Sequence, residues 1–232
     1  MFIDNLDKIR YRITAAAKRT NRDGDAIRLV VVTKYAPLED VKTALSSGLV
    51  FEVGENRVQD AEKKKISLGE LAGKVRWRLI GHLQTNKAKK AVAVFDAVDS
   101  IDSEKIAKAL DMALSDSERK LTVMIQVKLS ESETQSGATP AELPGLIEAV
   151  RKCPRLELQG LMGIAPNVEP LEAVRPSFRL LRELRDKHLP HGKLSMGMSR
   201  DFEIAIEEGA DLVRIGSQIF THHSSASMEA PA

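Results

Sequence analysis

Short apolar runs recur along the chain at the spacing typical of alternating strands and helices. Several of them are rich in β-branched residues, as in LVVVT, and are too short for helices. They occupy residues 29–33, 50–53, 75–80, 92–98, 121–127, 156–162, 193–196 and 212–215. We interpret these eight runs as strands.

Amphipathic segments separate consecutive runs. LEDVKTALSSG, SEKIAKALDMALSD and PAELPGLIEAVRKC are each long enough for a crossover helix. Nearly continuous apolar strands joined by helices indicate a parallel sheet that is buried on both faces. Eight such units favour an α/β fold with a single closed (β/α)8 TIM-type barrel. The alternative is an open doubly wound sheet, which usually has fewer strands.

An additional helix is expected before the first strand. Phe2, Leu6, Ile9 and Ile13 recur at spacings of three and four, which predicts an amphipathic helix over residues 2–20. The segment after residue 220, THHSSASMEAPA, is too polar for an outer helix, so the amino-terminal helix should cover that position. We therefore predict one domain over residues 1–221 and a disordered tail over 222–232.

Composition is that of an ordinary globular protein, with 43% apolar and 29% charged residues in 232. No stretch approaches the roughly 20 apolar residues of a membrane span, and MFIDNLDKIRYRI lacks the apolar core of a secretion signal. A cytoplasmic, monomeric protein is expected. The single cysteine, Cys153, excludes an internal disulfide and multi-cysteine metal sites.

Nucleic acid is not an expected partner. The 35 basic and 33 acidic residues leave a net charge of +2, and aromatic residues make up only 4%. We interpret the basic clusters at 63–65 and 87–90 as solvated helix faces. The five histidines show no convincing ligand spacing, so no metal site is predicted. His82 lies near the predicted barrel mouth, where a structural role in its loop is favoured over ligand contact.

Lys34 directly follows the first predicted strand. In a (β/α)8 barrel, the carboxyl ends of the strands carry the chemistry. A lysine there can simply pack its stem and extend its ammonium into water. In a partly dry cavity, its amine would instead be neutral and able to form a Schiff base with a carbonyl. Both interpretations remain open for Lys34 taken alone.

The segments SMGMSRD and RIGS follow the last two predicted strands, where such barrels commonly bind phosphate. Ser199, Gly216 and Ser217 could supply hydroxyl and backbone donors, although Ser199 could also be a simple helix cap. Asp201 would repel a phosphate unless its side chain points away. Arg214 lies within an apolar run and needs a partner, either a structural carboxylate or a ligand.

A Schiff-base lysine, a phosphate site and an arginine between them describe a receptor for pyridoxal 5′-phosphate. VVVTKYAP, VGENRVQDAEKK, WRLIGHLQTNKAKK, GLMGIAP and LSMGMSRDFEIAIEEGADLVRIGSQIF occur in the order of signature segments of a known family. The chain resembles the pyridoxal phosphate homeostasis protein family over about residues 29 to 220. That family is related to the amino-terminal barrel of alanine racemase.

The resemblance implies a cofactor site. Lys34 would form the Schiff base, Asn56 would line the pocket near the ring, and Arg214 would face the ring nitrogen. Ser199, Gly216 and Ser217 would hold the phosphate, with Met196 and Met198 packed beside it. Lys128, after the fifth predicted strand, and Arg78, in WRLIG, depart from residues that are common in the family.

Three functions are compatible with such a site: a carrier of pyridoxal phosphate in its homeostasis, an amino-acid racemase or lyase, and an interaction protein with a relict site. Apo forms of pyridoxal phosphate-dependent enzymes are candidate recipients for a carrier. Racemisation needs a base on each face of the amino acid. Tyr11 lies on the amino-terminal helix, and strand alternation should direct Tyr35 away from Lys34. We therefore predict a non-enzymatic carrier.

Overall fold

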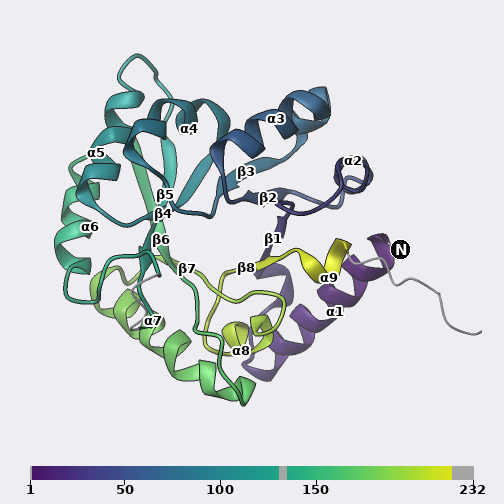
Figure 1. The fold of residues 1–232 in the computed structure, drawn as a ribbon. Helices are drawn as coiled ribbons and strands as arrows, with labels where there is room; N and C mark the ends of the chain where they lie inside the picture. Colours follow the sequence, from purple (N-terminus) through teal and green to yellow (C-terminus); the bar gives the residue numbers. More distant parts are fainter. Residues whose placement is uncertain (1, 131–134, 221–232) are drawn as a thin grey trace, which may run out of the picture.

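Eight parallel strands close into a barrel with helices outside it (Figure 1). The computed structural model describes residues 2–130 and 135–220. The strands are β1 (Arg28–Val32), β2 (Glu52–Glu55), β3 (Arg76–Leu79), β4 (Ala97–Ile101), β5 (Leu121–Val127), β6 (Leu156–Gly163), β7 (Lys193–Ser195) and β8 (Leu212–Ile215). The predicted (β/α)8 barrel is therefore confirmed.

Closure of the barrel depends on pairing between the first and last strands. β1 pairs in parallel with β8 from Arg28 opposite Leu212 to Val31 opposite Ile215, and it pairs with β2 on its other side. An open doubly wound sheet would leave β1 or another strand without a second neighbour. That alternative is wrong for this chain.

Two predicted strands were wrong over their first halves. The run 50–53 begins two residues before β2, which starts at Glu52. The run 92–98 contains the end of helix α4 (Ala88–Val94), and β4 begins only at Ala97. Ala88, Ala91 and Val92 are buried at helical spacing. The polar residues of α4, Lys89 and Lys90, lie in its first turn. Its last turn, AVAV, is a short apolar run that periodicity alone does not separate from a strand.

The outer layer consists of helices between the strands. They are α2 (Leu38–Ser46), α3 (Val58–Leu68), α4, α5 (Glu104–Ala113), α6 (Leu143–Arg151), α7 (Arg175–His188) and the short α8 (Phe202–Glu207) and α9 (Ser217–Phe220). Short 3₁₀ segments are η1 (Gly24–Ala26), η2 (Gly69–Lys74), η3 (Thr85–Lys87) and η4 (Leu171–Val174). Each long helix buries one apolar face against the strands.

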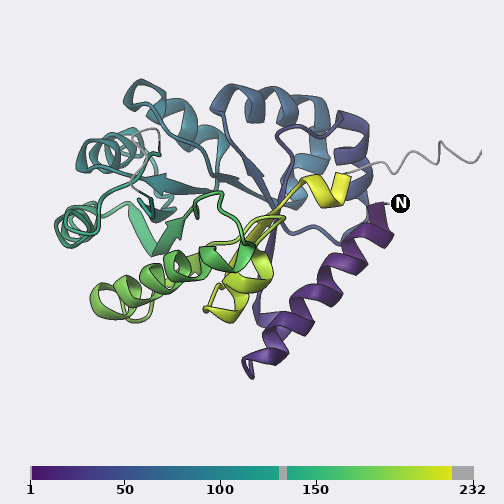
Figure 2. The same ribbon diagram turned by 60° about the horizontal axis from the view of Figure 1, so that its bottom comes forward.

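The additional helix α1 (Phe2–Arg19) lies outside the barrel beside α8 and α9 (Figures 1 and 2). The ring centroids of Phe2 and Phe220 are 6.1 Å apart, and Asn5 Nδ2 donates to the carbonyl of Ile219 at 3.2 Å. The amino-terminal helix therefore covers the expected position. The tail predicted for 222–232 lies outside the described residues.

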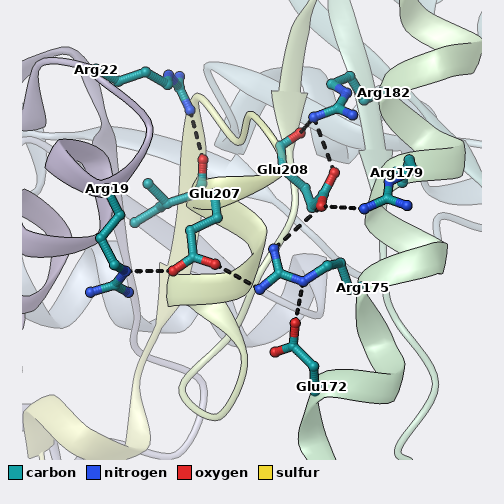
Figure 3. Close-up of polar contacts among 9 residues, drawn as sticks. Arg19, Arg22, Glu172, Arg175, Arg179, Arg182, Glu207 and Glu208 are labelled. Atoms are coloured by element: carbon teal, nitrogen blue, oxygen red, sulfur yellow. Dashed lines mark hydrogen bonds and ion pairs between the residues drawn. The ribbon is translucent and has the colours of Figure 1, made fainter.

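Arginines and glutamates tie α1, α7 and α8 together at their outer surfaces (Figure 3). Glu207 accepts from Arg19 of α1 at 2.6 Å and from Arg175 of α7 at 2.7 Å. Glu208, directly after α8, is only 4% exposed and lies between Arg175, Arg179 and Arg182. These ion pairs hold α8 in place against α1 and α7, because a helix of six residues is not stable by itself.

The barrel interior combines an apolar layer with a buried charge network. Val30, Met124, Met162 and Leu212 form a cluster separate from the outer core. Arg78 is fully buried and donates to both carboxylate oxygens of Asp99, at 2.9 and 2.7 Å, and to Glu52 at 2.7 Å. Burial alone would lower the pKa of Arg78, but the two carboxylates raise it above its usual value. Asp99 of β4 thus anchors this interior network.

The lysines at 63–65 are not all solvated, contrary to the prediction. Lys64 Nζ donates to the carbonyl of Thr33 at 2.6 Å and contacts Glu55, and its side chain is 13% exposed. Lys65 Nζ donates to the carbonyl of Val94 at 2.7 Å, and burial lowers its pKa. Both side chains fold back from α3 onto the barrel because their long apolar stems can cover it.

Candidate functional site at the barrel mouth

A cavity of about 870 Å³ opens at the carboxyl ends of the strands. Six of the seven predicted site residues line it: Lys34, Asn56, Ser199, Arg214, Gly216 and Ser217. They follow or end β1, β2, β7 and β8. Parallel strands bring their carboxyl ends to one rim, so residues almost 200 positions apart in sequence share this cavity.

Lys34 lines the cavity in a turn that follows β1. Its side chain is exposed, so the expectation of a partly dry amine is wrong. The Lys34 Nζ lies 5.0 Å from the centroid of the Tyr35 ring, and Tyr35 also lines the cavity. Tyr35 was expected to point away from Lys34. Strand alternation does not apply, because β1 ends at Val32 and the chain turns at both residues.

A buried clamp fixes the backbone just before Lys34 and Asn56. The Thr33 hydroxyl donates to Glu55 Oε1, and Lys64 contacts both Thr33 and Glu55 from α3. Glu55 is 1% exposed. The clamp therefore sets the relative positions of the two residues that follow. Glu55 lies two residues beyond the apolar run at 50–53, so the hydrophobic pattern carried no signal for the clamp.

Arg214 is buried in β8 at the base of the cavity. Its Nη1 donates to the carbonyl and hydroxyl oxygens of Ser195, both at 2.8 Å, and its Nη2 donates to the carbonyl of Gly163 at 2.9 Å. Among the residues that the structure describes, no carboxylate lies within ion-pair distance of Arg214. Burial lowers the pKa of Arg214 to about 10. The structural ion pair considered for Arg214 is thus not formed in the described part of the chain.

Two hydroxyl groups meet at the part of the cavity that is formed by the segments after β7 and β8. Ser217 Oγ donates to Ser199 Oγ at 3.0 Å, and Gln218 Nε2 donates to the carbonyl of Ser199 at 2.9 Å. Gly216 packs so closely on β1 that an added Cβ would lie 2.6 Å from the carbonyl oxygen of Val32. A side chain at Gly216 would therefore displace the strand end that carries Lys34.

Met196 does not reach the cavity, in contrast to its predicted place beside the phosphate. It is fully buried in the outer hydrophobic core. β7 ends at Ser195, whose hydroxyl points inward to Arg214, so alternation sends Met196 outward. Met198 lines the cavity instead. Ser195 was missed, although alternation along LSM could have identified it.

Asp201 turns back toward its own loop. Its Oδ1 accepts from the Met198 N–H at 2.6 Å, and the residue is 7% exposed while still lining the cavity. Burial raises the pKa of Asp201, and the Met198 N–H and Arg214 oppose this rise. The carboxylate is therefore held away from open solvent at a cost in free energy when it is charged.

Asp201→Asn is expected to change how stability depends on pH. Because the folded-state pKa of Asp201 is raised, its favourable contribution is present below the unfolded-state pKa and is lost as pH rises through the folded-state pKa. Asparagine does not titrate, so the variant does not lose this stability as pH rises. Urea unfolding at about pH 4 and about pH 7 should show the variant gaining stability relative to wild type at the higher pH. Asp116→Asn, at an exposed position, is the control. An identical pH dependence for both variants would contradict the assignment.

Within residues 2–130 and 135–220, no group of three or more His, Cys, Asp and Glu side chains could hold a metal ion. None of the helices in these ranges is both long enough and apolar enough to span a bilayer.

Comparison with known families defines the class of protein to which this barrel belongs. The family model described as the alanine racemase N-terminal domain matches residues 5–224. The pyridoxal phosphate homeostasis protein of Aquifex aeolicus (strain VF5) is 38% identical over 224 residues, which cover 94% of this chain and 96% of that protein. The protein of that name in Pseudomonas aeruginosa is 39% identical over 218 residues, 94% of each chain. The chain belongs to the pyridoxal phosphate homeostasis protein family, within the alanine racemase N-terminal domain class.

Solved structures agree with this assignment. PipY of Synechococcus elongatus PCC7942 with PLP bound is 30% identical, with a TM-score of 0.80 over 95% of this chain and all of that chain. The same protein without PLP gives 32% identity and a TM-score of 0.83. An alanine racemase of Clostridium difficile 630, at 14% identity and a TM-score of 0.72, matches 96% of this chain and 58% of its own length. That likeness concerns the fold alone.

Proposed function

We propose that this protein binds pyridoxal phosphate covalently at Lys34 and acts as an intracellular carrier that supplies the cofactor to other proteins. The observation that carries the proposal is the buried Arg214, whose hydrogen bonds go to neutral oxygens at the base of a cavity. A buried guanidinium has further N–H donors to satisfy, and a ring nitrogen facing the cavity would satisfy one. The homeostasis proteins of the family and PipY with PLP bound support the same ligand.

The residues around the cavity fit the chemical groups of pyridoxal phosphate. Lys34 supplies the amine for a Schiff base, Arg214 would face the ring nitrogen, and Asn56 would line the ring. The hydroxyls of Ser199 and Ser217, already 3.0 Å apart, would donate to the phosphate together with the backbone at Gly216. When bound, the cofactor supplies an electrophilic carbon and an electron-withdrawing ring.

Two features of the chain favour a carrier of the cofactor over an enzyme. Arg214 stays cationic at neutral pH and so disfavours a proton on the facing ring nitrogen, which weakens electron withdrawal by the ring. Lys34 is exposed, whereas catalytic sites usually exclude water from the reacting groups. An open Schiff base is instead accessible to an incoming amine. The apo forms of pyridoxal phosphate-dependent enzymes are the proposed recipients, and a cytoplasmic location and a monomeric state stay predictions.

A racemase or lyase is the second candidate, and one observation favours it. Tyr35 lies beside Lys34 at the cavity rim, so a second acid–base group is present after all. Its ring is 87% exposed, however. A phenol that extends into water is poorly placed as a general base for the α-carbon of a bound amino acid. Such a base must lie within hydrogen-bond reach of the proton that it removes.

Turnover in deuterated water distinguishes the two candidates. The protein loaded with pyridoxal phosphate is incubated with alanine and a panel of other amino acids, and α-proton exchange and optical rotation are followed. We expect exchange far below ordinary enzyme rates of about 1 per second or faster, together with transfer of the cofactor to an apo-enzyme. Turnover at such rates that disappears in Lys34→Ala would contradict the carrier.

A further inference from the structure

His82 lies on the cavity wall in the loop between β3 and η3, together with Lys34 and Asn56. The three residues follow β1, β2 and β3, which are neighbours in the barrel. His82 is about half exposed, with 53% of its side chain accessible. An imidazole on this wall is within the same cavity as the amine of Lys34.

Close packing fixes the loop that carries His82. An added Cβ at Gly81 would lie 2.3 Å from the carbonyl oxygen of Asn56, so only glycine lets this loop lie directly on the Asn56 backbone. The Ser100 hydroxyl, at the end of β4, donates to the Gly81 carbonyl at 2.7 Å. The position of His82 relative to Asn56 is therefore defined by backbone contacts.

A carboxylate orients the imidazole. His82 Nδ1 lies 3.0 Å from Asp102 Oδ2, and the Asp102 side chain is only 14% exposed. A carboxylate accepts hydrogen bonds, so Nδ1 carries the proton in this pair and the neutral ring keeps a lone pair on Nε2. This arrangement is that of an oriented general base, and a loop cap alone would need no such partner.

We propose that His82, oriented by Asp102, is the acid–base group that transfers the cofactor from Lys34 to an incoming primary amine, such as an amino acid. The inference rests on the proposed function. The amine nitrogen bonds to the carbon of the Lys34 Schiff base, and the bond from that carbon to Lys34 Nζ breaks. Two protons leave the incoming ammonium nitrogen through His82 Nε2, the first before it bonds to the carbon and the second afterwards. One of them goes to solvent, and the other passes from His82 to Lys34 Nζ. No electrons are gained or lost, and Lys34 ends as a free amine.

The chemistry requires such a group because amino-acid amines are mostly protonated at neutral pH and do not attack until a base removes a proton. Lys34 itself is part of the bond that breaks. Tyr35 is the other titratable side chain beside Lys34, and its ring is almost fully exposed. His82 is thus the acid–base group on this wall that a carboxylate orients.

The test compares two nucleophiles on protein loaded with pyridoxal phosphate. Loss of the visible absorption of the Schiff base is followed after mixing with alanine, which is protonated, or with methoxyamine, which is not. His82→Ala should slow the reaction with alanine about 100-fold and the reaction with methoxyamine by only a few-fold. Added imidazole should restore much of the alanine rate. His191→Ala, in an exposed loop before β7, is the matched control.

A second measurement needs no cofactor. Nitrogen-15 NMR of the imidazoles in the unloaded wild-type protein should show His82 with its proton on Nδ1, and Asp102→Asn should change this. Equal slowing with both nucleophiles, no effect of imidazole, or a proton on Nε2 would overturn the role of His82. Failure of the wild-type protein to form any Schiff base would instead overturn the proposed function, while the NMR result would still decide the tautomer.

Discussion

Lys34→Ala is expected to abolish covalent binding of pyridoxal phosphate while leaving the fold intact. Lys34 is the lysine at the end of β1 that lines the cavity with Arg214 and the paired serines. Its side chain is exposed and its described contact is the Tyr35 ring, worth about 0.5–1 kcal/mol at such a site. Borohydride reduction followed by peptide mass analysis should locate the adduct on Lys34 in wild type and find none in the variant.

The matched control is Lys89→Ala, an exposed lysine on α4. It should retain the wild-type adduct and visible absorption. A reduced adduct on Lys87 or Lys128 of the wild-type protein would contradict the assignment. Retention of the visible absorption by Lys34→Ala would contradict it as well.

Arg78→Met should destabilise the protein by about 3–5 kcal/mol, because it leaves Asp99 in the barrel interior without its ion-pair partner and leaves Glu52, among the described residues, with Arg28 alone. Arg78 and Asp99 are both 0% exposed, and Arg78 also donates to Glu52 at 2.7 Å. Chemical denaturation monitored by circular dichroism measures the loss. Arg76→Met provides the control on the same strand, since Arg76 is only partly buried and donates to the Thr122 hydroxyl.

A double variant tests the cause of that loss. Arg78→Met combined with Asp99→Asn removes one of the stranded charges, so it should cost less than the sum of the two single changes. Additive losses would show that Arg78 acts through its packing volume. A loss below about 1 kcal/mol for Arg78→Met would show that the interior charges are hydrated or neutral, in disagreement with their burial.

The sequence pattern predicted the architecture because the barrel is built from repeated local units. The runs 121–127 and 212–215 coincide with β5 and β8, since strands buried on both faces are apolar at every position. The pattern failed at 92–98 because the last turn of α4 is apolar and lies just before β4. Ring closure between β1 and β8 is a long-range property, and it followed only from the number of strands.

The candidate site was predictable where one residue type at a strand end sufficed, as for Lys34, Ser199 and Arg214. It was not predictable where the direction of a side chain depended on the last strand residue. Tyr35 was misplaced because β1 ends at Val32, before alternation reaches it. Met196 was placed by the family resemblance, whereas alternation along LSM directs it away from the side of Ser195. Strand boundaries are the least certain part of a sequence-based assignment, and one residue reverses the side-chain direction.

The position of α1 has a consequence for the order in which the chain can fold during synthesis. Its apolar stripe of Leu6, Ile9 and Ile13 packs against α8 and α9, which the ribosome makes about 200 residues later. Until those segments emerge, the nascent helix has only η1 and α2 as native neighbours among the described elements, and β1 has no β8 to pair with. Such non-local contacts slow folding and leave apolar surface open to other chains. Residues 202–220, which are made last among the described residues, therefore complete both the outer layer of helices and the closed barrel.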